Sequence, residues 1–244
     1  MGFSDEQIRN MLELKEDLAE KIIKYKEQIE KLEKNISVLD AILKQSSFTK
    51  ASDLTRNAPK TIKQERKIAI TKIVADGATR VIIENDLKPD IVVTDLDGDI
   101  KSLKKAGRTN TVMVVHAHGD NSEKIHLVKN FKNCVGTTQT KPIGKVHNFG
   151  GFTDGDRCVF LASNFKAKKI ILLGMDFGTR IGKYSKVSVI DRNTKIAKLR
   201  RGKKLLEWLV QKSESELYSI TKINGFTKIK FQDIDNIITS KNAF

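Results

Sequence analysis

The chain has 244 residues, 39% of them hydrophobic, which is enough for one large α/β domain or for a medium domain with an appendage. It has two cysteines, no secretory signal and no apolar run of about 18 residues, which argues against a disulfide framework or a membrane protein and favours a cytoplasmic setting. The net charge is +15, but residues 1–56 hold ten Lys/Arg against eleven Asp/Glu, so the positive excess lies in residues 57–244. Such a field favours phosphorylated ligands, nucleic acid or an anionic surface as the partner.

Residues 1–45 are predicted to form one long coiled-coil helix. Ser4-Asp5-Glu6-Gln7 is a capping-box pattern that opens it. Seam positions then repeat every seven residues, with Ile8, Lys15, Ile22, Ile29, Ile36 and Leu43 at one position and Met11, Leu18, Tyr25, Leu32 and Leu39 at the other. β-Branched residues at the first position with Leu at the second favour a parallel two-stranded coiled coil. We expect a homodimer through residues 8–43; the alternatives are a helix that packs on its own domain or one that binds a different partner.

The remainder of the chain is predicted to be a linker followed by an α/β domain. Residues 46–66 lose the heptad, gain Ser, Thr and Asn, and contain Pro59, as is typical of a linker. Residues 67–244 then alternate apolar strands with helical stretches, which indicates repeated βα units and a mostly parallel open sheet flanked by helices. Strands are expected at 68–75, 91–93, 111–115, 134–135 and 170–173, with helices up to Asn85 and at 100–105, 121–130, 156–165 and 205–212.

Acidic residues follow four of the predicted strands. They are Asp76 after the first, Asp95, Asp97 and Asp99 after the second, Asp120 after the third and Asp176 after the strand at 170–173. Ligands of an open parallel sheet bind beyond the carboxyl ends of its strands, so these residues are expected to share one sheet edge. Asp and Gly also form ordinary turns, which explains any one of these positions but explains the set of four less well.

Asp95 and Asp97 are the best candidates for binding a metal ion. In an extended segment they project to one side with Cα atoms roughly 7 Å apart. With a third carboxylate such as Asp154 they suit Mg²⁺, which is usually bound by a few carboxylates together with substrate phosphates. Since the domain is also strongly basic, this points to phosphoryl or pyrophosphoryl transfer from a nucleotide. No Walker A motif is present, so the chain is not a P-loop enzyme.

Three other patterns have more than one interpretation. His116 and His118 either hydrogen-bond to a substrate or phosphate, bind zinc together with Asp120, or are structural. The glycine-rich segment 148–157 opens a helix and resembles a phosphate cradle, although Asp154 and Asp156 within it would bind metal. The basic stretch 195–204 is either a solvated helix face or a set of phosphate contacts.

Six motifs in this order resemble the archaeal 6-hydroxymethyl-7,8-dihydropterin pyrophosphokinases, the MptE-like family, which is similar to the thiamine pyrophosphokinases. They are VADGAT (74–79), PDIVVTDLDGD (89–99), VVHAHGDN (114–121), GTTQ (136–139), NFGGFTDGDR (148–157) and ILLGMDFG (171–178), and the resemblance covers roughly residues 67–240. It implies transfer of pyrophosphate from ATP to a pterin hydroxymethyl group with Mg²⁺ and release of AMP.

The resemblance also implies roles for individual residues. Asp95, Asp97 and Asp154 would bind the metal. Residues implied to lie by the nucleotide or substrate are Asp76, Gly77, Ala78, Thr79, Thr137, Thr138 and Gln139, with His116, His118, Asp120 and Asn121 on the pterin or phosphate side. Asp156 and Asp176, in the last two motifs, are predicted to line the same crevice.

The chain departs from the family pattern before the VADGAT strand. Family members usually have another strand there that ends in a glycine-proline-serine loop, whereas this chain has Ala58-Pro59-Lys60 and then the linker. The alternative function is therefore a catalytically impaired member that acts as a basic dimer binding nucleic acid or another polyanion. Only 6% of the residues are aromatic, which disfavours single-stranded RNA as that polyanion.

Overall fold

The computed structural model describes residues 70–177 and 192–240, together with seven isolated helical positions between residues 20 and 33. Apart from those seven positions, the coiled coil at 1–45, the linker at 46–66 and the dimer seam through 8–43 lie outside the described residues and stay predictions. Within the described part of the chain, no helix is both long and apolar enough to cross a lipid bilayer.

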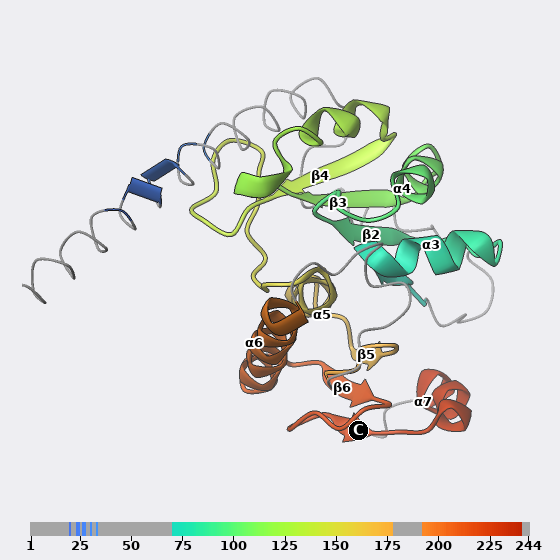
Figure 1. Cartoon of the computed structure of the whole chain (residues 1–244). Helices are drawn as coiled ribbons and strands as arrows, with labels where there is room; N and C mark the ends of the chain where they lie inside the picture. Colours follow the sequence, from blue (N-terminus) through green and yellow to red (C-terminus); the bar gives the residue numbers. More distant parts are fainter. Residues whose placement is uncertain are drawn as a thin grey trace, which may run out of the picture.

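Four short apolar segments pair in sequence order to form a parallel sheet (Figure 1). They are β1 (Ile73–Ala75), β2 (Ile91–Thr94), β3 (Val112–His116) and β4 (Asn133–Thr137). β3 is buried along its whole length, and a strand covered on both faces needs an unbroken run of apolar residues. All four strands end at the same edge, with Ala75 beside Val93, Thr94 beside Val115, and His116 beside Thr137.

Helical connections between these strands cover one face of the sheet. The connections are α3 (Asp76–Glu84), α4 (Ile100–Gly107) and two 3₁₀ helices, η1 (Gly119–Asn121) and η2 (Ile125–Asn130). Their apolar side chains form one core cluster with the strand residues that point to this face, such as Val92, Met113 and Val115. Two neighbouring parallel strands can be joined only by a long crossover connection, which is usually helical. The alternation of strands and helices in the sequence is therefore the one that a parallel sheet requires.

The other face of the sheet is covered by α5 (Asp154–Asn164). Leu161 of α5 packs there in a second cluster with Val93, Val114 and Val135, which alternate along their strands with the residues of the first cluster. The first residue of α5 thereby comes to the carboxyl edge of the sheet, where the acidic loops lie.

The C-terminal part forms a second, smaller parallel sheet against the opposite side of α5 (Figure 1). Its strands are β5 (Lys169–Leu172), β6 (Glu216–Ser219) and β7 (Thr227–Lys228), and it is accompanied by α6 (Arg192–Val210), η3 (Phe231–Asp233) and α7 (Ile234–Thr239). Val159 and Phe160 of α5 pack into its core with Leu206 and Leu209 of α6. α5 is therefore shared by both sheets.

The predicted α/β class with a mostly parallel sheet and flanking helices is confirmed, with three local corrections. Asp176 follows β5, which pairs with β6 and not with the first sheet, so its expected place on the shared edge is wrong. The helix expected at 121–130 is instead the pair η1 and η2. The basic stretch 195–204 does not precede a helix but lies inside α6.

Candidate active site

The loop after β2 exposes two carboxylates and buries the residue between them. Leu96 has a positive φ of 68° and a fully buried side chain that packs in the first core cluster. This left-handed conformation is strained for leucine, and such strain is found mostly at functional sites. It leaves Asp95 and Asp97 partly exposed at the sheet edge, with the Asp97 N–H donating to Asp95 Oδ1 at 3.2 Å.

A third carboxylate comes from the neighbouring strand. Asp76 is the first residue of α3, directly after β1, and only 3% of its surface is exposed. The Thr94 hydroxyl donates a hydrogen bond to Asp76 Oδ1, and its oxygen accepts from the Leu96 N–H at 2.8 Å. A Cβ at Gly98 would collide with Asp76 Oδ2. Glycine is thus required at this position for the carboxylate to approach the loop.

Asp154, the first residue of α5, completes a group of four carboxylates. One oxygen from each of Asp76, Asp95, Asp97 and Asp154 lies within 4.8 Å of the other three. The structure therefore brings together the three predicted metal ligands and adds Asp76, which we had expected beside the nucleotide. A set of oxygen ligands this close together fits a hard divalent cation such as Mg²⁺.

The electrostatics of this group also fit a cation. Burial, helped by the charges of Asp95 and Asp97 and opposed by the hydrogen bond from Thr94, raises the pKa of Asp76 to about 8. Burial and the same neighbouring carboxylates raise the pKa of Asp154 well above its usual range. Holding four negative charges together is therefore unfavourable without a cation, and a bound cation would remove that repulsion.

The raised pKa values predict how the stability of the metal-free protein changes with pH. An Asp76 carboxyl with a pKa of about 8 when folded and 3.8 when unfolded stabilises the folded state fully below pH 3.8, and this contribution is lost as the pH rises to 8. We expect the free energy of unfolding in EDTA to fall between pH 6.5 and 8, by at most about 1.4 kcal/mol per pH unit for this group. Urea titrations at several pH values measure it.

Asp76→Asn is the control for this pH dependence, because its amide does not titrate. It should reduce the slope between pH 6.5 and 8, and Asp154, whose pKa is also raised, accounts for the slope that remains. His116 contributes below pH 6.5, where its depressed pKa makes stability fall as the pH falls, so the upper window excludes His116. An unchanged slope in the Asp76→Asn variant would contradict the assignment.

His118 holds Asp95 in place. Its Nδ1 accepts a hydrogen bond from the Asp120 N–H at 3.3 Å, so in the neutral ring Nε2 carries the hydrogen, which points to Asp95 Oδ2 at 3.3 Å. The Asn121 amide also donates to the backbone oxygens of Asp95 and His116, at 2.8 and 2.7 Å. The turn after β3 thus fixes the end of β2, and His118 and Asn121 position a carboxylate.

His116 is a buried, neutral imidazole next to this group. Burial, and then the nearby charges of Arg157 and His118, lower the pKa of His116 to about 3. Its Nδ1 lies 3.2 Å from the hydroxyl of Thr137, which donates to the Val115 carbonyl at 3.3 Å, so Nδ1 carries the hydrogen and Nε2 has a free lone pair. No described residue hydrogen-bonds to Nε2. The nitrogen is itself buried, so only a water molecule or a group that enters this part of the site could donate a hydrogen bond to it.

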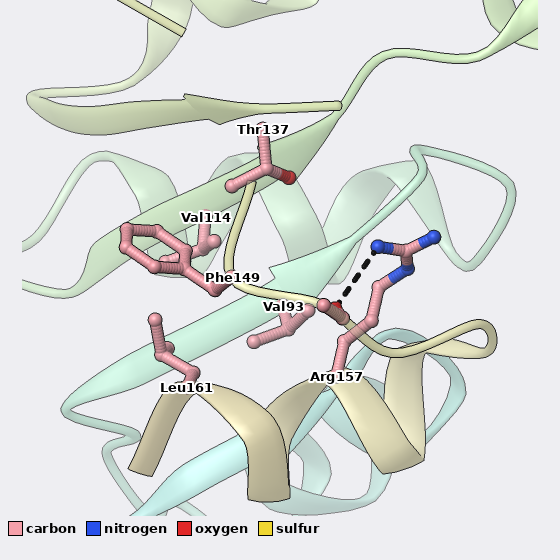
Figure 2. Close-up of a pocket in the computed structure, with 7 residues that line it drawn as sticks. Val93, Val114, Thr137, Phe149, Arg157 and Leu161 are labelled. Atoms are coloured by element: carbon pink, nitrogen blue, oxygen red, sulfur yellow. Dashed lines mark hydrogen bonds between the residues drawn. The ribbon is translucent and has the colours of Figure 1, made fainter. Parts of the chain in front are cut away.

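Arg157 is a buried cation that sequence reasoning missed. It is 6% exposed and lies one turn after Asp154 in α5; burial lowers the pKa of its guanidinium, and the charges of Asp154, Asp156 and Asp95 oppose that shift. Figure 2 shows it with Thr137 around a cavity of about 10 Å³, donating to the Gly150 carbonyl at 3.3 Å. A Cβ at Gly151 would approach Arg157 Cγ to 2.7 Å. Gly151 therefore leaves room for the backbone and the first methylene groups of Arg157, and the cavity is about the size of one water molecule.

Asp156 has a different role from the one predicted by its motif. Its fully buried carboxylate accepts hydrogen bonds from the Phe152 N–H at 2.6 Å, the Thr153 N–H at 2.8 Å and the Thr153 hydroxyl. This is a capping box for α5.

The remaining predicted residues are placed as follows. Gly77, Ala78 and Thr79 form the first turn of α3 behind Asp76; Thr138 is buried after β4; Gln139 and Asp120 are exposed; and Asp176 is exposed after β5. The arrangement of the described residues does not support zinc binding by His116, His118 and Asp120. The set of side chains there that could bind a metal ion consists of the four carboxylates and does not include these three residues.

Comparison with known proteins agrees with this geometry. Residues 54–182, just over half of the chain, match the family described as 6-hydroxymethylpterin diphosphokinase MptE-like. The chain belongs to the MptE-like family. The resemblance noted in the sequence is confirmed, and the match contains β1 to β5 and all four carboxylates.

Three relatives are named 6-hydroxymethyl-7,8-dihydropterin pyrophosphokinase. The protein of Pyrococcus furiosus is 50% identical over 151 residues, which is 60% of this chain and 65% of the relative. That of Methanocaldococcus jannaschii is 50% identical over 155 residues (59% and 64%), and that of Methanothermobacter thermautotrophicus 45% over 146 residues (57% and 63%). The chain thus spans a little under two thirds of the length of the relatives it matches.

Proposed function

We propose that this protein transfers a pyrophosphoryl group from ATP to the hydroxyl of 6-hydroxymethyl-7,8-dihydropterin, with Mg²⁺ as cofactor. The observation that carries the proposal is the group of four carboxylates at the carboxyl edge of a parallel sheet, in a chain of the MptE-like family. The names of the three relatives supply the acceptor. Magnesium at the carboxylates would neutralise charge on the phosphates.

In this reaction the acceptor oxygen bonds to the β-phosphorus while the bond from that phosphorus to the bridging oxygen of the α-phosphate breaks. AMP leaves with the bridging oxygen, and the hydroxyl proton is lost. The protein contributes mainly by positioning groups in line and by stabilising charge. Asp95 is oriented for this by His118 and Asn121, while Arg157 places a fixed positive charge on the α5 side of the site.

His116 and Thr137 suit recognition of the acceptor on the β3–β4 side of the edge. A neutral imidazole with a free Nε2 lone pair accepts a hydrogen bond from an N–H group, which a pterin ring offers. The site is then divided, with phosphates over the carboxylates of β1, β2 and α5 and the heterocycle beside His116.

The proposal predicts pterin-dependent formation of AMP. When the protein is incubated with ATP, Mg²⁺ and 6-hydroxymethyl-7,8-dihydropterin, AMP and the pterin diphosphate should form in equal amounts. Chromatography with ultraviolet detection measures both products. EDTA should stop the reaction, and the 6-methyl analogue, which lacks the hydroxyl, should give no AMP. ADP as the nucleotide product would show single phosphoryl transfer, and no pterin-dependent product would refute the proposed function.

A further inference from the structure

The N-terminal half of α6 is a concentrated source of positive charge that the proposed chemistry has not used. Residues 192–204 contain seven Lys/Arg and no Asp/Glu. They lie outside residues 54–182, which match the family. Their position relative to the carboxylates follows from how α6 packs on α5.

The two helices meet at the first turn of α5. Gly202 sits so close to it that a Cβ would lie 2.8 Å from Asp156 Oδ1 and 3.5 Å from the Thr153 hydroxyl. Further along, Trp208 stacks on Phe160 with ring centres 6.3 Å apart. Position 202 therefore lies beside 156 and position 208 beside 160, so the two helices run in the same general direction.

Because of this pairing, α6 extends beyond the start of α5. α5 begins two residues before Asp156, whereas α6 begins ten residues before Gly202. At 1.5 Å per residue the extra eight residues overhang the N-terminus of α5 by about 12 Å. That end of α5 carries Asp154, so the overhanging residues 192–199 lie toward the end of α5 where the carboxylate group is.

Two basic residues in the N-terminal half of α6 face this side. Lys198 lies one turn before Gly202 and on the same helix face as Gly202, Leu206 and Leu209, which pack against α5. Arg201 places its guanidinium carbon 5.1 Å from the centre of the Phe152 ring, two residues before Asp154. Arg200 and Lys204, by contrast, lie on the opposite face, about 160° and 200° around the helix from Gly202.

We propose that the N-terminal half of α6 holds the triphosphate of the nucleotide above the carboxylate group, through Lys198 and Arg201. This inference rests on the proposed function. A triphosphate brought next to four carboxylates needs positive charge besides the metal, and Lys198 and Arg201 are both exposed to solvent and therefore accessible to phosphate oxygens. α6 would thus complete the nucleotide site from outside the part of the chain that matches the family.

The experiment compares two double variants with equal loss of charge. Binding of a non-hydrolysable ATP analogue with Mg²⁺ is measured by calorimetry for the wild-type protein, K198Q/R201Q and R200Q/K204Q. We expect the dissociation constant to rise by at least about tenfold for K198Q/R201Q, since two charge-assisted contacts are lost, and to change less than about twofold for R200Q/K204Q. Thermal unfolding of each variant checks that the helix still docks, and R201K keeps the charge if the Phe152 contact proves necessary for folding.

Each outcome decides the inference. Weaker nucleotide binding by K198Q/R201Q, but not by R200Q/K204Q, supports the inference. This holds even if the wild-type protein makes no AMP from the pterin; that result would refute the proposed function and leave the nucleotide contact of α6 standing. Equal weakening in both double variants indicates a diffuse field and overturns it, as does unchanged affinity in K198Q/R201Q. A wild-type protein that transfers pyrophosphate to the pterin while K198Q/R201Q keeps its nucleotide affinity refutes only the role of α6.

Discussion

Asp97→Asn is expected to lower kcat for AMP formation by at least about a hundredfold, which corresponds to roughly 2.7 kcal/mol of transition-state stabilisation. Asp97 supplies one of the four oxygens that lie within 4.8 Å of one another, and its side chain is partly exposed at the sheet edge. The amide has nearly the same shape but binds Mg²⁺ much more weakly, because a hard cation prefers charged oxygen. A misplaced metal would no longer neutralise the phosphates, and positioning with charge neutralisation is most of what such an enzyme contributes.

The stability of the Asp97→Asn variant separates this explanation from a folding defect. Without metal its thermal midpoint should stay constant or rise, because one of the charges that raises the pKa of Asp76 is removed. Asp99→Asn, two residues further on, is the matched control. Asp99 lies outside the carboxylate group and caps α4 by accepting from the Ser102 N–H at 2.8 Å, a bond that the Asn Oδ1 can also accept, so Asp99→Asn should cost little stability and little activity. Retained AMP production by Asp97→Asn would show that the metal assignment is wrong.

The sequence predicts the sheet and most of the carboxylate group because both follow from local patterns. Apolar runs such as 91–94 end in acids, and parallel strands place their carboxyl ends together. Asp95 and Asp97 lie two apart, which predicts a common direction. The structure achieves this through the positive φ of Leu96, which no local pattern indicates, because leucine rarely adopts that conformation.

Other features depend on tertiary contacts that a local pattern does not contain. The strand before Asp176 is recognisable, but its partner β6 comes from residues 216–219, a short and partly polar segment with weak strand character. Arg157 follows an acidic motif, and from the sequence alone it would be predicted to be a solvent-exposed helix residue. It is buried because α5 packs on the sheet. The close approach of Gly202 to Asp156 joins positions 46 residues apart.

Asp154 and Asp156 show most directly how two aspartates only two positions apart can have different roles. Both stand in the first turn of α5, where the helix dipole favours negative charge, and both fit the metal-binding interpretation of the motif. Asp154 joins the carboxylate group, whereas Asp156 points back and caps the helix. The side-chain direction is set by the capping box with Thr153, and a Thr-x-x-Asp pattern predicts that geometry as well as it predicts a metal ligand.

Asp156→Asn is therefore expected to destabilise the protein, while Asp154→Asn is expected to inactivate it. In Asp156→Asn the amide nitrogen replaces one acceptor, so either the Phe152 or the Thr153 N–H faces a second donor in a buried site. Losing a charge-assisted bond and leaving a buried donor unpaired costs about 3 kcal/mol, or roughly 10 °C in Tm for a chain of this size. Asp154→Asn should keep or raise the Tm without metal, because burial and neighbouring carboxylates raise the pKa of the Asp154 carboxyl group. Thermal unfolding in EDTA together with AMP assays on both variants gives the comparison, and a larger loss of Tm in Asp154→Asn than in Asp156→Asn would reverse the two roles.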